Sequence, residues 1–477
     1  MNKRLLLVIP ALALAAISCV TETPTNTNSV VVSSPTPAAS PSPSPGVVAE
    51  SVSVPVTLPV LDALLADESF KSELKAKLKL TDDQIAALRK ASAEEIGGLR
   101  ETGSEPEEGA AAEARDRATE VIQGVVGAQQ TEALLSLARE RWLKGSEADD
   151  SGKPAEATML PGPNAVPQDT RVIVNIPAYR MDLFQEGKLI KSYRIGIGYP
   201  QFPLPTGLRK AQTIIFNPTW TPPDEPWVAK MKDIAVGEKV AAGSPLNPLG
   251  PIKIPIGMPS LIHGGKPMAK IGTFASHGCV GLTNAQIKDF ARTLTAAVGK
   301  EVSDQTIAGY LKDSTKTRSV KLDAPVPVEL RYETIVVEDG KLYIHKDVYD
   351  QNTNTEENLN ITLARSNVRF EDFSPEERDQ VREALNAMSS RPQKQVAKEA
   401  NANANTSPAV STNNANENSA KANANAKKPK TPRKPISRKQ KQVVLEIAAL
   451  GGKGYPAPVE LDSGSGKPAK KIVTKTE

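Results

Sequence analysis

The sequence predicts a multidomain protein in which a small α-helical module precedes a β-rich domain with one main helix, and disordered segments flank both. Helical spacing of apolar residues before about residue 144 and short β-branched runs after residue 170 support this organisation. The 39 prolines and the 4% aromatic content of the 477 residues indicate that much of the chain builds no core. Folded cores are therefore expected to be local.

The N-terminus predicts export from the cytoplasm. Lys3 and Arg4 precede an apolar run over 5–17, which is too short to span a bilayer and is typical of a secretory signal. The run ends in AISC, which resembles the lipobox of bacterial lipoproteins, so 1–19 is predicted to be a lipoprotein-type signal peptide and Cys19 its lipidation site. An ordinary cleavage site with an incidental cysteine is the alternative. Either reading predicts a cell-envelope or periplasmic protein, and the lipoprotein reading adds a membrane anchor.

Residues 20–59 are rich in Pro, Ser and Thr and predict an extended tether. Residues 60–144 are rich in Ala, Leu and Glu. Their apolar side chains recur at three- and four-residue spacings, which predicts a module of amphipathic helices. Residues 145–169 form a second linker.

The β-rich domain is predicted over 170–300, where short β-branched runs are separated by Gly and Pro. Two runs, 181–184 and 189–193, are spaced as a hairpin. One helix is predicted over 284–298, opened by a capping box of Thr283 and Gln286. Residues 301–349 are predicted to be a β-containing extension of this domain, with a second hairpin around Asp339 and Gly340.

Beyond the extension, 350–394 predicts a helical segment, because SPEE at 374–377 is a capped helix start. Residues 395–441 are Asn/Ala-rich and then basic, which predicts disorder, and 442–477 is left as a C-terminal tail. The basic run has eight Lys or Arg among fifteen residues and suits an anionic wall polymer or a soluble spacer equally well. The net charge of +4 gives no reason to expect a nucleic-acid partner.

The residues that carry chemistry are IHGG at 262–265 and ASHGCVGLTN at 275–284, which contain two of the three histidines. A nucleophilic cysteine needs a base within hydrogen-bond reach, a group that orients the base, and donors for the developing oxyanion. His263 lies sixteen residues before Cys279, a separation that suits a neighbouring strand or loop. A helix starting near Thr283 would favour the thiolate, with the Cys279 and Gly278 amides as oxyanion donors.

Two other interpretations compete with catalysis. A zinc site is disfavoured because His345 is distant and structural zinc sites collect four close ligands. An inert core cysteine is disfavoured because glycines and His277 surround Cys279. Catalysis without a metal or cofactor is the favoured interpretation.

The spacing from His263 to Cys279 resembles the YkuD-type L,D-transpeptidase catalytic domain family, over roughly 170–300. PTG at 205–207 and NPLG at 247–250 are similar to segments around the family's cleft. The resemblance implies that Cys279 is the nucleophile, His263 the general base and acid, and that the Gly264 carbonyl orients His263. It further implies that His277 shapes the oxyanion site and that substrate is bound by Ser276, Gly278 and Asn284.

The resemblance implies attack on the third residue of a peptidoglycan stem tetrapeptide, loss of D-alanine, and transfer of the resulting thioester to an amine. The product is a 3→3 cross-link or a protein attached to the wall; an L,D-carboxypeptidase and a non-catalytic wall-tethering lipoprotein are the alternatives. Gly281 stands where the family commonly has arginine. Lys266 and Lys270 are candidates to supply that charge, and the acceptor stays open.

Overall fold

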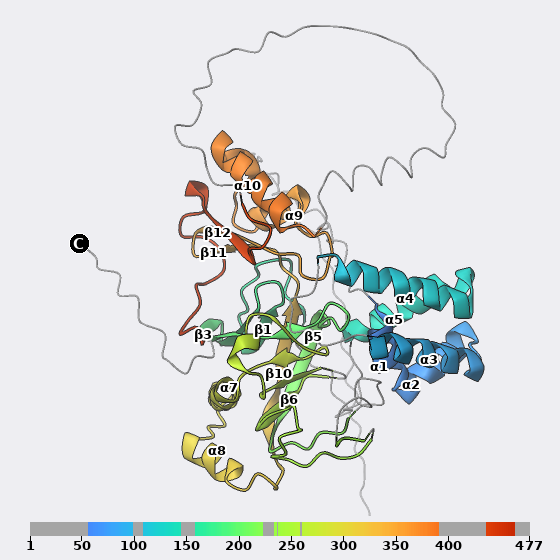
Figure 1. The fold of residues 1–477 in the computed structure, drawn as a ribbon. Coiled ribbons are helices and arrows are strands. Elements are labelled where there is room, and N and C mark those ends of the chain that lie inside the picture. Colours follow the sequence, from blue (N-terminus) through green and yellow to red (C-terminus); the bar gives the residue numbers. More distant parts are fainter. Residues whose placement is uncertain are drawn as a thin grey trace, which may run out of the picture. The chain divides into compact units, whose positions relative to one another are not determined.

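Figure 1 shows the computed structural model, which describes residues 56–98, 108–144, 158–222, 233–235, 237–257, 260–390 and 436–462. All of them belong to one compact unit, Ala49–Glu477. The predicted signal peptide with Cys19, nearly all of the tether, and the Asn/Ala-rich stretch lie outside the described residues. Within the described ranges, no helix is both long enough and apolar enough to cross a membrane.

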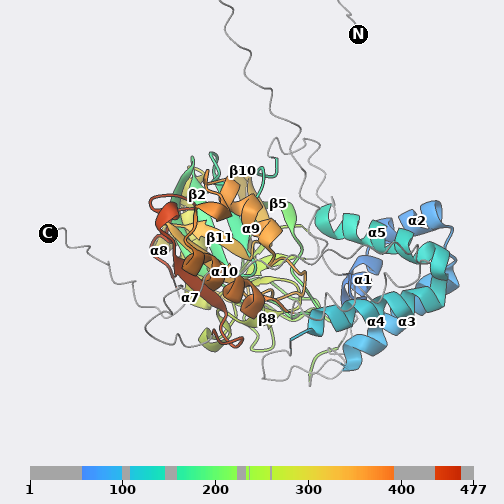
Figure 2. The same ribbon diagram turned by 90° about the horizontal axis from the view of Figure 1, so that it is seen from above.

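The N-terminal helical region is confirmed (Figure 2). Its helices are α1 (Leu58–Leu65), α2 (Glu68–Leu78), α3 (Asp82–Gly98), α4 (Ala110–Val126) and α5 (Ala128–Lys144). Side chains fix two of the starts: the Asp67 carboxylate accepts from the Ser69 amide, and Thr81 and Gln84 form a reciprocal pair before α3. The apolar positions share a core whose fully buried members include Leu61, Leu65, Phe70, Leu74 and Leu88.

The β-rich domain is built on a large sheet with the strand order β3-β2-β1-β10-β5-β6-β7-β9. Its strands are β1 (Arg171–Asn175), β2 (Arg180–Gln185), β3 (Lys188–Arg194), β5 (Gly207–Phe216), β6 (Ile252–Pro255), β7 (Leu261–His263), β9 (Val280–Gly281) and β10 (Arg318–Arg331). Strands β4 (Ile197–Gly198) and β8 (Phe274–Ser276) form a separate parallel pair.

The first predicted hairpin is confirmed as β2 and β3. Glu186 and Gly187 join them with φ of 47° and 80°. Two consecutive residues with positive φ are what a tight hairpin turn needs to match the right-handed twist of its strands.

Strand β10 corrects the predicted end of the catalytic domain at residue 300. It lies in the middle of the large sheet, parallel to β1 and antiparallel to β5. Pro325 and Pro327 argue against a central strand in the sequence, because proline donates no ladder hydrogen bond. A register shift between Lys321 and Val326 spans Pro325, whereas Pro327 is paired with Lys210. The sheet is completed only by residue 331.

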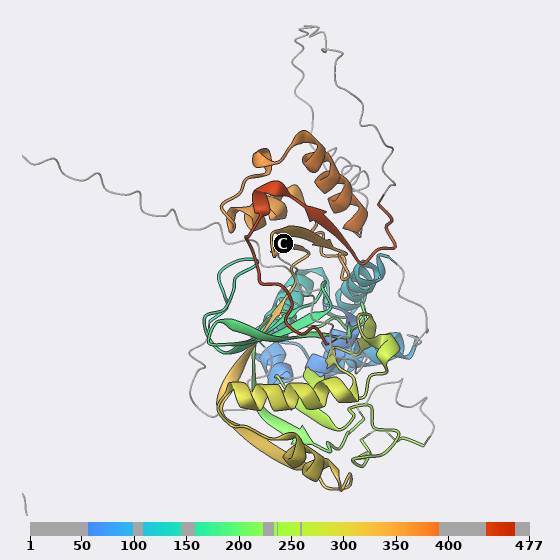
Figure 3. The ribbon, with the colours of Figure 1, turned by 90° about the vertical axis from the view of Figure 1, so that its left-hand side faces the viewer.

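The predicted helix is α7 (Asn284–Ala297), and both hydrogen bonds of its Thr283–Gln286 capping box are present. Figure 3 shows α7 along the large sheet. Its buried residues Ile287, Phe290 and Leu294 join the core on that face. A second helix, α8 (Asp304–Leu311), follows, so the expectation of one main helix is incomplete.

A smaller sheet, in the order β11-β12-β13, covers part of the other face of the large sheet. Its elements and neighbours are β11 (Ile335–Glu338), β12 (Lys341–His345), β13 (Gln442–Glu446), α9 (Glu356–Ala364), α10 (Pro375–Met388), and the short 3₁₀ turns Phe370–Asp372 and Ala448–Leu450. Its Ile335, Val337 and Ile344 pack with residues of α9 and α10, whereas Val336 joins a cluster with Ile173 of the large sheet.

The assignment of 442–477 to a tail is wrong for its first part. Strand β13 pairs with β12, and backbone hydrogen bonds join Val459 and Asp462 to Ser192 and Arg194 of β3. A five-residue strand whose partner lies about a hundred residues earlier gives no local signal, which explains the error.

Candidate active site

Two neighbouring parallel strands bring His263 close to Cys279. His263 ends β7 and lies in register with Gly281 of β9, and the Leu282 amide donates to the His263 carbonyl at 2.9 Å. Cys279 lies in the turn immediately before β9, two residues ahead of Gly281, so strand pairing brings the backbone that carries the thiol next to β7. The sixteen-residue separation is thus closed by strand pairing.

The His263 ring is held by its own backbone neighbour. Its Nδ1 lies 2.7 Å from the Gly264 carbonyl oxygen, which only accepts, so Nδ1 carries the proton and Nε2 is the basic nitrogen of the neutral ring. The side chain is buried. Burial, and then the charge of Lys266, lower the pKa of His263 to about 3, against the opposing effect of the Gly264 and Leu249 backbone. The ring is therefore neutral at physiological pH.

Cys279 sits on a tight turn locked by serine hydroxyls. The Ser276 Oγ accepts from the Cys279 amide at 3.0 Å and donates to the Cys279 carbonyl at 2.5 Å. The Ser260 hydroxyl donates to the Gly278 carbonyl at 2.9 Å. Gly278 has φ of 88°, a backbone conformation that favours glycine. Ser276 therefore holds the turn that presents the thiol.

Cys279 is a half-buried residue whose thiol is desolvated and neutral. Burial raises its pKa above 9.0, while the Leu261 backbone and the charges of Lys266 and Lys253 act in the opposite direction. The pKa directions of Cys279 and His263 both favour the uncharged pair. The expectation of a thiolate held ionised by the helix start is therefore not met, because desolvation dominates.

The Cys279 amide, expected to be an oxyanion donor, already donates to Ser276. Its use as a donor to substrate requires that hydrogen bond to open.

His277 packs on aromatic rings beside the turn. Its ring lies edge-on to Phe202, with centroids 4.4 Å apart, and 5.8 Å from Tyr199. Burial and Lys266 lower its pKa to about 4. A neutral ring fixed by aromatic contacts is suited to shaping a site, and that role stays a prediction.

Asn284, predicted to bind substrate, has a hydrogen bond within the protein. Its Oδ1 accepts from the Gly265 amide at 2.8 Å. A Cβ on Gly250 would lie 2.6 Å from this Oδ1 and 2.4 Å from the Gly265 nitrogen. Asn284 and the close-packed glycines thus hold the loop that follows His263.

Lys266 lies over Gly281, the position at which the family resemblance led us to expect an arginine. A Cβ on Gly281 would come within 2.8 Å of Lys266 Cγ and 3.2 Å of its Cε, so the lysine stem runs over the glycine. Lys270, the other candidate, directs its Nζ to the Tyr199 hydroxyl at 3.3 Å. Lys266 also acts on the pKa values of Cys279, His263 and His277, which marks it as the shared cation of this cluster.

Sequence reasoning missed Lys253 and Ser260. Lys253 lies on β6 in register with His263, and burial lowers its pKa while the Cys279 charge raises it. The alternation IKI at 252–254 could have identified Lys253, because it places one polar side chain between two buried ones. Ser260 had no signal, because its contact is with the backbone of a distant turn. His345 lies on β12, away from this pair of strands.

Comparisons with known proteins find one matching family and several similar solved structures. Residues 169–328 match the YkuD family, described as the L,D-transpeptidase catalytic domain. A comparison with curated proteins finds no match. The chain is similar to the solved catalytic domain of Enterococcus faecium L,D-transpeptidase, at 17% identity and a TM-score of 0.22, covering 35% of this chain and 100% of that one.

An L,D-transpeptidase from Mycobacterium smegmatis is similar at 13% identity and a TM-score of 0.20, covering 34% of this chain and 58% of that one. The chain spans half the length of a longer Enterococcus faecium L,D-transpeptidase structure, at 16% identity and a TM-score of 0.22, with 34% of this chain covered. Residues 169–328 are therefore the part of the chain that matches the YkuD family model of L,D-transpeptidase catalytic domains.

Proposed function

We propose that the protein is an L,D-transpeptidase that acts on peptidoglycan stem peptides through a thioester on Cys279. It forms 3→3 cross-links or attaches proteins to the wall. The observation that carries the proposal is the parallel register of β7 and β9, which pairs His263 with Gly281, two residues after Cys279. The family of residues 169–328 supports the substrate class.

The neutral pair supports proton transfer coupled to attack. As Sγ of Cys279 bonds to the carbonyl carbon of the third stem residue, its proton passes to Nε2 of His263. The imidazolium then protonates the departing nitrogen of D-alanine, and a thioester remains. The amine of an acceptor gives its proton to His263 as it attacks, and the thiol regains that proton as it leaves. Gly264 keeps the ring oriented throughout by accepting from Nδ1.

Lys266 supplies the positive charge that the reaction needs. Transfer of the thiol proton leaves a thiolate in a desolvated position, and the Lys266 charge lowers the pKa of Cys279. The same charge opposes protonation of His263. Gly281 is required for this arrangement, because any side chain there would displace the lysine stem.

The proposal includes the cell envelope as the site of action. Peptidoglycan lies outside the cytoplasm, and the N-terminal signal with Cys19 supports export and lipid anchoring. The basic run before β13 supports contact with an anionic wall polymer.

The test is incubation of the full chain with disaccharide-tetrapeptide, followed by mass spectrometry of the products. Release of D-alanine with a cross-linked dimer supports transpeptidation. Release of D-alanine with tripeptide alone, in the presence of excess amine acceptor, identifies an L,D-carboxypeptidase instead. A folded chain that releases no D-alanine supports the wall-tethering alternative.

A carbapenem provides a second measurement that needs no acceptor. Intact mass should show one covalent adduct on the wild type and none on Cys279→Ser. The exposed Lys288→Met, on α7, is the matched control and should form the adduct at the wild-type rate. An adduct that persists in Cys279→Ser would contradict the assignment of the nucleophile.

A further inference from the structure

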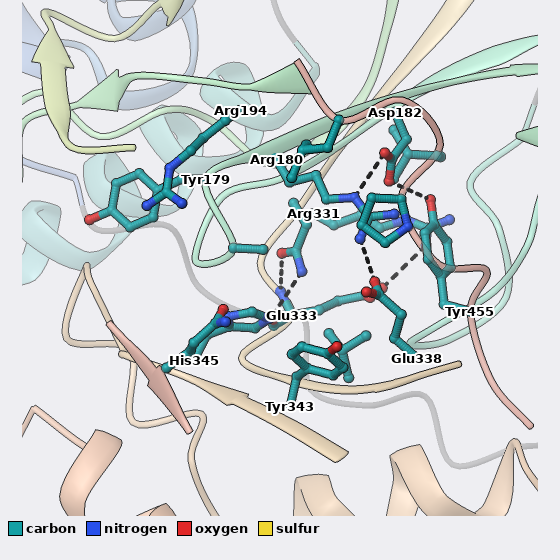
Figure 4. Close-up of a pocket in the computed structure, with 17 residues that line it drawn as sticks. Tyr179, Arg180, Asp182, Arg194, Arg331, Glu333, Glu338, Tyr343, His345 and Tyr455 are labelled. Carbon is teal, nitrogen blue, oxygen red and sulfur yellow. Dashed lines mark hydrogen bonds and ion pairs between the residues drawn. The ribbon is translucent and has the colours of Figure 1, made fainter. Parts of the chain in front are cut away.

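A polar cavity lies between the large sheet and the small sheet, on the face opposite α7. Its volume is about 210 Å³, and it is closed on one side by the segment that carries Tyr455 (Figure 4). Figure 4 shows Arg180 and Asp182 of the large sheet facing Glu338 and His345 of the small one. The lining residues include none of those placed at the thiol.

The large sheet contributes a row of three arginines to this cavity. Arg194 pairs in register with Arg180, Arg180 with Asn175, and Asn175 with Arg331, so the row crosses β3, β2, β1 and β10. Residues in register lie on the same face of a sheet, and like charges in such positions repel unless they are compensated. All four line the cavity.

Arg180 and Arg331 each pair with two carboxylates, but only Arg180 has a hydrogen bond from every guanidinium nitrogen. Arg180 contacts Asp182 at 2.8 Å and also Glu338. Arg331 uses Nε for Glu329 at 2.8 Å, while its Nη1 lies 3.5 Å from the Glu333 carboxylate.

Arg331 is 5% exposed, and neither Nη1 nor Nη2 has a hydrogen-bond partner among the described residues. Buried guanidinium nitrogens without acceptors are costly, so an acceptor in the cavity would be stabilising.

We propose that this cavity is a second binding site, which takes the carboxylate of a small amino acid on the terminal nitrogens of Arg331. Nη1 and Nη2 form a planar fork that matches the two oxygens of a carboxylate. The Glu333 carboxylate, 3.5 Å from Nη1, is the group that would pair with the ammonium of the same molecule. The exposed Arg194 lies at the rim.

Size and charge select this class over other oxyanions. The cavity is smaller than the roughly 300–1,000 Å³ of sites for drug-sized ligands, which excludes a stem peptide or a sugar chain. Inorganic phosphate also fits an arginine fork, but Asp182, Glu333 and Glu338 in the walls repel a second negative charge. An amino acid brings one negative and one positive charge. The inference does not depend on the proposed reaction.

The test is calorimetric titration of the full chain carrying Cys279→Ala, which removes turnover. Glycine, D-alanine and L-alanine are the amino-acid probes, with acetate and inorganic phosphate beside them. We expect at least one amino acid to bind more tightly than acetate or phosphate. Arg331→Lys keeps the charge but loses the fork, and should weaken binding by about 10- to 100-fold.

Ala178→Leu is a second variant that touches no ion pair. Ala178 lines the cavity, and a larger side chain there should weaken binding without disturbing Arg331. Lys288→Met should bind as tightly as the parent. Absence of binding by every amino acid, tighter binding of phosphate, or unchanged amino-acid binding in both Arg331→Lys and Ala178→Leu would each overturn the proposal.

Discussion

The large sheet buries ionisable side chains in two regions, and burial has opposite consequences in them. Beside β7 and β9, His263 and Cys279 are desolvated without a carboxylate partner, and burial moves both pKa values toward the neutral pair. Beneath the small sheet, arginines and carboxylates are desolvated together and contact one another. Burial without a counter-charge keeps the proton-exchanging pair of Cys279 and His263 neutral. The arginines and carboxylates beneath the small sheet stay charged because they pair with one another.

The largest expected effect is that of Cys279→Ala, which should abolish the activity of one region and leave binding in the other unchanged. Cys279→Ala should lower D-alanine release from disaccharide-tetrapeptide by about 10³-fold or more, because no other group replaces the nucleophile. The same variant should bind amino acids in the arginine cavity as the wild type does. Loss of both properties in a folded Cys279→Ala chain would show that the regions are not independent.

Removal of Arg331 should affect stability. Arg331→Met leaves Glu329 with one fewer cation and Glu333 without its nearest one, so the free energy of unfolding should fall by about 3 kcal/mol in urea titration. Arg331→Lys should lose less. Equal stability of wild type and Arg331→Met would mean that the buried charges of this cavity are not coupled as described.

The pH dependence of stability gives a smaller effect, carried by His345 in the cavity wall. Burial lowers the pKa of His345 to about 4, below the ordinary 6.5, so the unfolded chain binds more protons between these values. This contribution to stability is present above pH 6.5 and is lost as the pH falls toward 4.

The loss amounts to roughly 2 kcal/mol between pH 7 and pH 4.5. His345→Gln should reduce the difference between urea titrations at these two pH values, although His263 and His277 contribute with the same sign. An unchanged difference would contradict the burial of a neutral His345.

The smallest effect tests the cation at the thiol. Lys266→Ala should raise the pKa of Cys279 further and slow its alkylation by iodoacetamide at pH 8 by about tenfold. Gly281→Ala should act in the same direction by displacing the Lys266 stem.

A double variant with Lys266→Ala and Gly281→Ala tests whether Gly281 acts through Lys266. If Gly281 acts through Lys266, Gly281→Ala should add little to Lys266→Ala, a non-additivity that a double-mutant cycle measures. Full additivity would contradict the contact.

The parts of the fold that the sequence predicted are those with local signals. The hairpin of β2 and β3 and the capping box of α7 depend on residues within a few positions of one another. Strand β10 was harder to predict as a central strand, because Pro325 and Pro327 argued against one. Its neighbours β1 and β5 also lie more than a hundred residues earlier in the sequence.

At the candidate site, the motif predicted that Cys279 and His263 act together, but it did not predict that both side chains are neutral. Their pKa values depend on burial and on Lys253 and Lys266, which come from another strand and from a loop. The arginine cavity was invisible for the same reason. Its arginines lie side by side only after β3, β2, β1 and β10 have paired.

The pairing of β12 with β13 has a consequence for biogenesis. Lys341 and Glu446 are ion-pair partners 105 residues apart, so the small sheet cannot close until the ribosome has synthesised β13. Contacts of such high sequence separation form slowly. A nonsense or frameshift lesion between His345 and Gln442 would therefore spare Cys279 and His263 while leaving β12 as an unpaired edge, exposed to aggregation.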